Sequence, residues 1–599
     1  MDILAESAYH TPLNNSPLLP LLLLSLATQR NYPIQSSSFK KEYDYIVVGG
    51  GSAGSVVASR LSEEPCVSVL LLEAGAKKPP LLSDIPGLAR FTWNTDIDWQ
   101  FKTVPQKHTG YGLVNKQVIW PSGKGLGGSS LMNAMLYVRG NHKDYDNWAA
   151  QGAKGWSYKD VLPYFLKLED NRNIEFLENG YHASGGPITV EKPGYNSEIK
   201  TRIHEAAQQL GYKVLDSNGA RQTGFYDHQA NIRNGQRCNT AKAYLVPVEN
   251  RTNLDIVGGA HVKKILFDGS RAFGVQFDYQ NSEHIVKARR EVIMSAGTTN
   301  TAQLLMLSGI GPREHLEKLK IPVIKDLPVG NNFQDHCATF LPFVINQKPL
   351  NEKIKDPQNI REYIDSRRGP LSSTEFISSM AFLGGQEEED FPDHELYFAE
   401  INKLILKEQI GLKPIIYKLL FGLYANGPMF ICLSQLLHPK SRGTVRLQST
   451  NPYDPPLIDP NYFDHPEDIE AIVKGLRTCR KMGSSKPMKK LGLKPFATVL
   501  PWFTKFIPNL DYYYKFIARL AVITLSHQVG TAKMGDPADP TTVVDPQLKV
   551  KGIQGLRVVD ASVMPLVPSG NTNIPTIMVA EKASDIIKKS ISCKSKADI

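Results

Sequence analysis

The sequence predicts an α/β protein built from two lobes. With 599 residues the chain exceeds the usual size of a single hydrophobic core, so two lobes or domains are expected. Short apolar runs near residues 45, 70, 293 and 557 resemble buried strands, and helical patterns separate them. Because these runs come from both ends of the chain, we predict that the two ends share one parallel sheet.

A stretch from residue 45 to residue 73 follows the order strand, glycine turn, helix, strand and acid. In this stretch Gly49 allows a tight turn, Gly51 lets the backbone approach a pyrophosphate, and Gly54 lets the helix pack closely on the strand. The helix N-terminus offers free N–H groups and a partial positive charge to phosphates. Glu73 stands where a carboxylate can accept hydrogen bonds from ribose hydroxyls. The stretch predicts a Rossmann-type dinucleotide site, for FAD or NAD rather than NADP.

A second glycine-rich stretch runs from residue 120 to residue 133. Four glycines and three serines fall within residues 122–130, which excludes the interior of a helix or strand. An apolar run, 131–138, follows directly. We therefore predict a loop whose backbone presses against a ligand, rather than a flexible linker.

The composition excludes several classes of protein. The formal charge of +10 is modest for this length and forms no arginine-rich tract, so we expect no nucleic-acid partner. The six cysteines are scattered and form no CxxC pair, which argues against a zinc site. Their positions do not decide the redox compartment.

Two apolar segments leave the cellular location open. Residues 17–27 could be the core of a secretion signal, with a cleavage site at Ser25-Leu26-Ala27, but no lysine or arginine precedes them. The alternative is an N-terminal segment that docks on the protein. Residues 403–424 mix apolar side chains with lysines, so peripheral membrane contact and an amphipathic helix covering the second lobe both fit.

Further elements follow from periodicity and turn residues. After the second glycine-rich stretch, the sequence shows both helical and strand patterns up to the C-terminus. The predicted helices are 156–168, 197–210, 299–308, 464–482 and 574–588, and the predicted strands are 254–257, 262–267, 272–279, 291–297 and 443–447.

Several separate motifs together resemble one family, the FAD-dependent glucose–methanol–choline (GMC) oxidoreductases. They are the unit at 49–73, the loop at 123–146, the segment 297–311, the Ser-His-Gln-Val-Gly-Thr stretch at 526–531, and 559–573. The resemblance covers about residues 43–588. Its one departure is Ala302, where proline or serine is usual. Segments 141–146 and 304–311 look most like the arthropod glucose dehydrogenase branch, which uses quinone acceptors.

The resemblance implies a cofactor, FAD rather than NAD, and a set of residues that hold it. The ADP half is assigned to the first glycine unit, the adenine to Val262, and the flavin with its pyrophosphate to the second loop and two C-terminal segments. The implied residues are Gly49, Gly51, Ser52, Ala53, Gly54, Glu73, Gly128, Ser130, Asn133, Ala134, Met135, Leu136, Val262, Asp560, Ala561, Thr572, Asn573 and Pro575. Met132 replaces the histidine that some members use for covalent attachment, so we expect noncovalent FAD.

The resemblance also implies the domain limits. We expect an N-terminal segment at 1–40, an FAD-binding domain at 41–330 and a substrate-binding lobe at 331–511 with a mainly antiparallel sheet and helices. Residues 512–590 return to the FAD domain and carry the catalytic residues, and 591–599 form a tail.

The implied chemistry is oxidation of an alcohol or sugar CH–OH group by hydride transfer to flavin N5. His527 matches the catalytic base, a task that suits a side chain with a pKa near neutrality. Asn571 matches the second polar partner and can donate to the substrate oxygen. His336 resembles a structural turn. The electron acceptor is a quinone-like molecule or oxygen. An oxygen-using alcohol oxidase, a lyase of the hydroxynitrile type and a protein without enzymatic activity remain alternatives, and the substrate is open.

Overall fold

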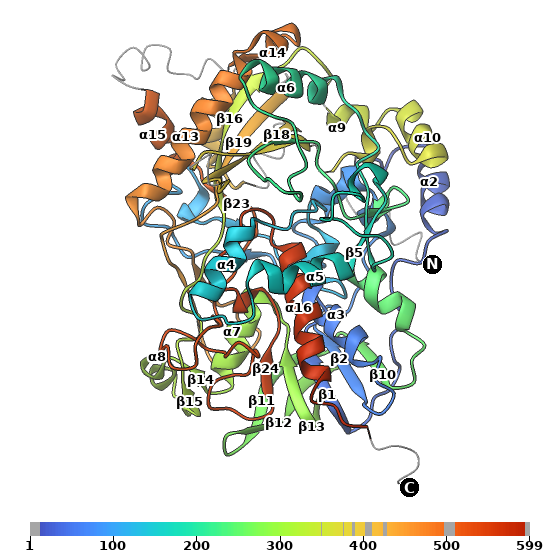
Figure 1. The fold of residues 1–599 in the computed structure, drawn as a ribbon, viewed down its shortest axis with the longest axis vertical. Coiled ribbons are helices and arrows are strands. Elements are labelled where there is room, and N and C mark those ends of the chain that lie inside the picture. The colour runs from blue at the N-terminus through green and yellow to red at the C-terminus, as the bar shows by residue number, and fades with distance from the viewer. Residues whose placement is uncertain are drawn as a thin grey trace.

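The computed structural model describes residues 12–348, 350–374, 377–385, 390–401, 410–422, 428–495 and 510–593. These residues form two lobes, each built on a seven-stranded sheet. Figure 1 shows the first sheet in the lower half of the molecule and the second in the upper half, with helices around both. The predicted two-lobed α/β architecture is confirmed.

The first sheet has the strand order β10, β2, β1, β13, β12, β11, and β24 pairs with β13. The bounds are Glu42–Val48 (β1), Val69–Glu73 (β2), Leu254–Gly258 (β10), His261–Asp268 (β11), Arg271–Tyr279 (β12), Ser282–Met294 (β13) and Leu556–Val558 (β24). The pairs of β1 with β2 and β13, and of β13 with β24, are parallel. Val48, Met294 and Val558 stand level at the carboxyl edge, where sheets of this kind bind ligands. The predicted sharing of one sheet by both chain ends is confirmed.

Two helices from opposite ends of the chain pack together against this sheet (Figure 1). They are α3 (Ser52–Leu61) and α16 (Asn573–Lys588), and Arg60 on the first pairs with the fully buried Glu581 on the second at 2.8 Å. A Cβ added to Gly54 would lie 1.8 Å from the carbonyl oxygen of Gly49. Glycine is therefore required for the close packing that the sequence predicted. The other predicted helices are present with slightly shifted ends: Tyr158–Leu168 (α5), Glu198–Gln209 (α6), Gly297–Leu307 (α7) and Pro466–Gly483 (α13).

The second sheet is antiparallel, with the order β22, β16, β19, β18, β17, β7, and β23 pairs with β16. The bounds are Gly224–Tyr226 (β7), Cys337–Val344 (β16), Ile377–Leu383 (β17), His394–Ile401 (β18), Met429–Leu436 (β19), Lys494–Pro495 (β22) and Ile523–Thr524 (β23). Strands β7 and β23 lie outside residues 331–511. The second lobe thus draws strands from both flanking regions, which the expected domain limits had placed elsewhere.

A disulfide fastens α13 to this sheet. It joins Cys432 of β19 to Cys479 of α13, with the two Cα atoms 5.7 Å apart. The neighbours of Cys432 along β19, Ile431 and Leu433, line the cavity described below. Because side chains alternate across a strand, α13 covers the face of the sheet that points away from the cavity.

Replacing Cys432 and Cys479 together by alanine is expected to lower the free energy of unfolding by about 4 kcal/mol, because the bridge spans 47 residues of chain. Urea denaturation measures this. Cys238→Ala is the matched control, since Cys238 is buried and not disulfide-bonded. Equal losses in the double variant and the control would show that the bridge adds no stability.

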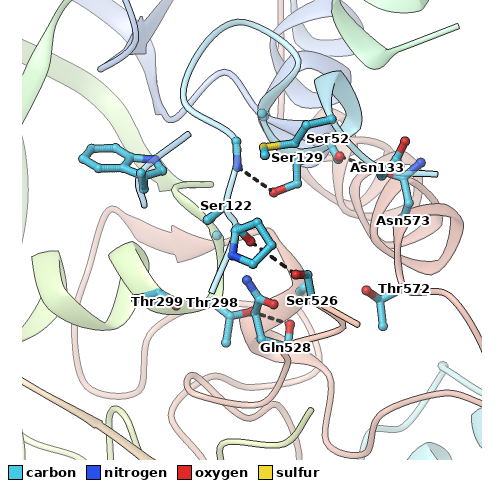
Figure 2. Close-up of a pocket in the computed structure, with 18 of the residues that line it drawn as sticks. Ser52, Ser122, Ser129, Asn133, Thr298, Thr299, Ser526, Gln528, Thr572 and Asn573 are labelled. Atoms are coloured by element: carbon cyan, nitrogen blue, oxygen red, sulfur yellow. Dashed lines mark hydrogen bonds between the residues drawn. The ribbon is translucent and has the colours of Figure 1, made fainter. Parts of the chain in front are cut away.

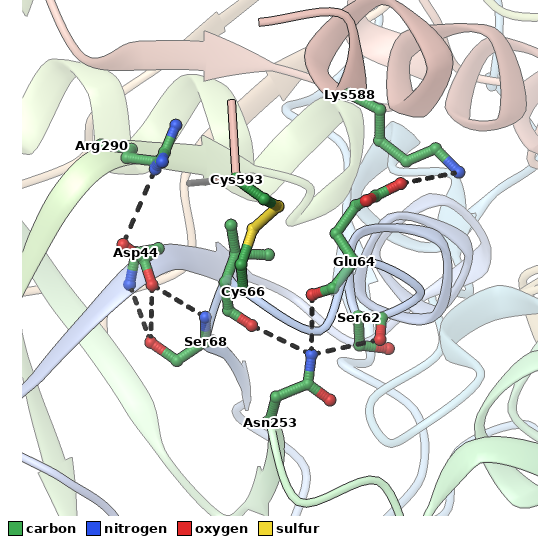
Figure 3. The surroundings of a disulfide bond; sticks show 10 residues. Asp44, Ser62, Glu64, Cys66, Ser68, Asn253, Arg290, Lys588 and Cys593 are labelled. Carbon is green, nitrogen blue, oxygen red and sulfur yellow. Dashed lines mark hydrogen bonds and ion pairs between the residues drawn. A yellow bond between two sulfur atoms is a disulfide. The ribbon is translucent and has the colours of Figure 1, made fainter. Parts of the chain in front are cut away.

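A second disulfide, Cys66–Cys593, joins the turn after α3 to the end of the described chain. Figure 3 shows it beside Asn253, whose amide donates to the backbone carbonyls of Ser62, Glu64 and Val67. The first residues of the expected tail, up to Cys593, are therefore attached to the first lobe.

The two apolar segments differ in how far the structure describes them. The N-terminal run forms α2 (Leu19–Leu26) beside α10 (Pro357–Ser366), with Leu22, Leu23 and Leu26 buried (Figure 1). Of the two alternatives for this segment, a secretion signal or a docked segment, the structure shows the segment docked on the protein. In place of the helix expected over 403–424, the described part holds only α12 (Pro414–Phe421), and residues 402–409 and 423–427 lie outside the described residues. Within the described chain, no helix is both long and apolar enough to span a membrane.

Candidate active site

One cavity of about 340 Å³ lies between the two lobes. The carboxyl edge of the first sheet and one face of the second sheet both line it. Figure 2 shows polar side chains from several segments pointing into it. Most of the residues assigned from the sequence meet here: Gly49, Gly51, Ser52, Ala53, Glu73, Gly128, Asn133, Ala134, Met135, Leu136, Val262, His527, Asp560, Ala561, Asn571, Thr572 and Asn573.

Three residues of the expected cofactor set do not line the cavity. Gly54 lies within α3, where it allows the close packing described above. The hydroxyl of Ser130 donates to the carbonyl of Gly127 at 2.6 Å, so it stabilises the glycine loop from behind. Pro575 is buried in the first turn of α16. These three residues support the site and do not form its surface.

The cavity contains a cradle that fits a pyrophosphate. The N-termini of α3 and α16 both reach it, and Ser52 donates to Asn573 at 2.8 Å where they meet (Figure 2). Such N-termini present free N–H groups and partial positive charge. A Cβ on Gly128 would lie 2.6 Å from the Cα of Gly51, so only glycine permits this close approach of the two loops. The two glycine-rich stretches of the sequence thus form one binding surface.

Glu73 lines the cavity with its carboxylate held by the backbone. Its two oxygens accept from the N–H groups of Gly50 and Gly75, each at 2.8 Å. Burial raises the pKa of Glu73, and these backbone hydrogen bonds oppose that rise. Each oxygen keeps further acceptor capacity. The position therefore suits the expected contact with ribose hydroxyls.

Glu73→Ala is expected to release a large share of the bound FAD, because the variant loses both the ribose acceptor and the support of the Gly50 turn. The FAD-to-protein ratio after gel filtration measures the loss. Glu73→Gln, which keeps one acceptor oxygen, should retain more FAD than the alanine variant. Full retention by Glu73→Ala would contradict the assignment.

Asp560 lines the cavity, but its carboxylate is occupied by protein groups. It accepts from the N–H of Gly297 at 2.9 Å and from the hydroxyl of Thr301 at 2.6 Å, and its other oxygen accepts from Ser562. Asp560 therefore fastens the end of β24 to the start of α7. The side chain forms part of the cavity wall. Because its carboxylate already accepts hydrogen bonds from the protein, the backbone of Asp560 is the part that is available to contact a cofactor.

His527 and Asn571 approach each other at the cavity wall. His527 Nε2 lies 3.0 Å from Asn571 Nδ2, and the backbone N–H of His527 donates to Asp335 Oδ1 at 2.7 Å. The preceding residue, Ser526, has a φ of +58°, so the chain turns sharply just before the histidine. Burial lowers the pKa of His527 to about 3. The imidazole is thus neutral near pH 7 and carries a proton on one ring nitrogen and a lone pair on the other.

His336, expected to be structural only, contacts the ring of His527. Its Nε2 lies 2.9 Å from the carbonyl oxygen of Leu437, and a carbonyl can only accept, so Nε2 carries the proton. Its Nδ1 is then an acceptor shared by two donors, His527 Nδ1 at 3.0 Å and the Gln435 amide at 3.1 Å. His527 donates from Nδ1 and keeps its lone pair on Nε2, beside Asn571. The sequence contained a signal for this contact in the adjacent pair Asp335-His336. Both residues hydrogen-bond to His527, Asp335 to its backbone N–H and His336 to its ring.

Several buried atoms at the cavity lack a partner. Among the described residues, Asn571 Oδ1, Gln528 Oε1 and Thr299 Oγ1 line the cavity and accept or donate no hydrogen bond. Buried polar groups are normally paired, so these atoms indicate a polar ligand. Together with the glycine cradle and the two helix N-termini, they fit a flavin dinucleotide.

Comparison with known proteins identifies the family. The GMC oxidoreductase models match residues 43–338 and 439–580. The chain belongs to the GMC oxidoreductase family. It is 38% identical to the glucose dehydrogenase (FAD, quinone) of Drosophila pseudoobscura pseudoobscura, over 92% of this chain and 88% of that protein. It is 36% identical to human mitochondrial choline dehydrogenase, over 92% and 91%.

Solved structures agree with this assignment. Pyridoxine 4-oxidase from Mesorbium loti superposes with a TM-score of 0.78 at 28% identity, covering 92% of this chain and all of that one. As a GMC oxidoreductase, the protein is a flavoprotein oxidoreductase that acts on CH–OH donors, and family membership supports FAD as its cofactor. The family resemblance inferred from the sequence is confirmed.

Proposed function

We propose that this GMC oxidoreductase oxidises an alcohol or sugar and passes the electrons to a quinone-like acceptor. The observation that carries the proposal is His527, a buried neutral imidazole at the cavity wall whose Nε2 lone pair accepts from the Asn571 amide, a contact that a substrate hydroxyl would replace. A base of this kind within hydrogen-bond reach of a hydroxyl is what alcohol oxidation requires.

The residues of this chain take the following roles. His527 Nε2 accepts the hydroxyl proton of the substrate, while the hydrogen bond from its Nδ1 to His336 fixes the ring and its tautomer. The Asn571 amide donates to the oxygen as negative charge develops on it. When bound, FAD supplies the hydride acceptor. Asp335 keeps the base in place through the backbone of His527.

The acceptor is inferred from relatives. One relative is named as quinone-dependent, and the one from Brucella ovis is an oxygen-dependent choline dehydrogenase at 36% identity. Mixing the reduced protein with a soluble quinone and, separately, with oxygen distinguishes the two. Faster reoxidation by the quinone supports the proposal, and faster reoxidation by oxygen with release of hydrogen peroxide would make the protein an oxidase.

We propose that FAD binds noncovalently, because Met132 occupies the position before Asn133 and its thioether has no proton to lose in forming a bond to the flavin. Precipitation with trichloroacetic acid should leave the flavin in the supernatant. Yellow colour that stays with the pellet would contradict this.

The two disulfides favour an oxidising compartment, and we propose that the protein is exported from the cytosol. Thiol counting on protein isolated from its native source under alkylating conditions tests this. The expected result is that only Cys238 and Cys337 react after denaturation.

A further inference from the structure

The floor of the cavity is a patch of the second sheet, and strand register shows how it is built. Phe340 of β16, Leu433 of β19 and Tyr397 of β18 stand directly opposite one another. All three line the cavity. In the next row of the same face, Ile431 stands opposite Ala399, and both line the cavity too. The floor therefore consists of two rows of side chains, of which only Tyr397 carries a polar atom.

The polar groups of this face lie one row away, where Glu395, Gln435 and His336 contact one another. Glu395 and Gln435 stand opposite each other, two residues along from Tyr397 and Leu433. Both are fully buried, and Gln435 donates to Glu395 at 3.0 Å and to His336 at 3.1 Å. The Tyr397 hydroxyl interacts with the Glu395 carboxyl group and opposes the rise of its pKa that burial causes. The one polar atom of the floor is thus turned toward these partners.

The sides of the floor are apolar as well. Ile377, Ile410, Ile523 and Leu525 line the cavity around it. Two polar neighbours of these residues, Thr524 and Ser526, also line the cavity. The Thr524 hydroxyl donates to Asp335 at 2.7 Å, and the Ser526 hydroxyl donates to the carbonyl of Pro121 at 3.3 Å. His527 and Asn571 are therefore the residues that we expect to make polar contacts near the reacting carbon.

Besides the carboxylates of Glu73 and Asp560, the cationic side chain of Arg90 lines the cavity outside the floor. Arg90 holds its guanidinium 4.3 Å from the centre of the Trp93 ring. A guanidinium donates hydrogen bonds and accepts none. It cannot satisfy the several hydroxyl protons of a sugar.

We infer that the substrate is an alcohol with an apolar body, such as an alkyl, aryl or isoprenoid chain, and not a sugar. A sugar bound on this floor would leave its remaining hydroxyls without partners, and each such buried hydroxyl costs about tenfold in affinity. An apolar chain gains by leaving water, by about fourfold for each buried methylene. This inference rests on the proposed alcohol oxidation.

The test is anaerobic flavin reduction by straight-chain 1-alkanols from ethanol to decanol, with D-glucose as the polar comparison. We expect kcat/KM to rise about fourfold per methylene until the floor is covered, and glucose to lie at least about a hundredfold below hexanol. A flat series with faster reduction by glucose would overturn the substrate class and leave alcohol oxidation intact. No bleaching by any of these compounds in FAD-loaded protein would refute the proposed function, and the substrate class with it.

A variant localises the effect to the floor. Ile431→Asn should lower kcat/KM for octanol by about tenfold or more and change ethanol by less than about threefold, because only the longer chain reaches that row. Ile431→Leu, which conserves volume, is the control and should keep the slope of the series. Equal losses for octanol and ethanol in folded, FAD-loaded Ile431→Asn would contradict the placement. If this variant does not fold, the wild-type alkanol series decides alone.

Discussion

His527→Gln is expected to lower the rate of flavin reduction by about 10²- to 10⁴-fold, while the protein keeps its FAD. Glutamine fills a similar space but has no basic lone pair to take the hydroxyl proton. The ring that it replaces is buried and neutral, with Nε2 accepting from the Asn571 amide at the cavity wall and its other nitrogen hydrogen-bonded to His336. Stopped-flow absorbance under anaerobic conditions measures the rate.

The control for His527→Gln is His108→Gln, because His108 lies half-exposed beside Asp464 and outside the cavity. The control should reduce its flavin at the wild-type rate. If His527→Gln also stayed within about threefold of wild type, which is far below the effect of losing a general base, another group would have to be the base.

Asn571→Ala is expected to lower flavin reduction by about 10²- to 10³-fold, through loss of the donor to the developing alkoxide. Its Nδ2 lies 3.0 Å from His527 Nε2, so the donor and the base lie side by side at the same place on the cavity wall. An interaction made mainly in the transition state lowers kcat and kcat/KM together. Steady-state kinetics with one alcohol therefore separate this role from simple substrate binding.

Asn571→His is the matched variant, since histidine can also donate at this position. It should recover a large part of the activity that alanine loses. An increase in KM alone for Asn571→Ala, with kcat unchanged, would indicate that Asn571 only binds substrate.

Local motifs predicted most of the residues that line the glycine-rich side of the cavity, and their contacts with FAD stay a prediction. Gly49, Gly51 and Gly128 have their roles fixed by turns and close backbone approach, which short stretches of sequence reveal. The motif at 526–531 singled out His527 for the same reason, and the structure locates His527 at the cavity with Asn571, while its role as the base stays a prediction. The docked N-terminal helix was one of two alternatives, since an apolar run by itself does not show what it packs against.

The substrate side could not be predicted in this way. The floor rows depend on which strands pair and in what register, as in the alignment of Phe340 with Leu433 and Tyr397. These contacts join residues far apart in the chain, and no local pattern fixes them. The contact of His336 with His527 was missed for the same reason. Ser130 was misplaced because a loop sequence does not show which side chains turn away from the ligand.

The most direct test of the central claim is the visible spectrum of the purified protein, taken without oxygen before and after addition of an alcohol. The account predicts flavin absorption bands that bleach when octanol is added. Bound flavin that no alcohol and no sugar bleaches would contradict the redox role and favour a lyase. Protein that holds no flavin at all would contradict the claim that the glycine cradle formed by Gly51 and Gly128 binds the pyrophosphate of FAD.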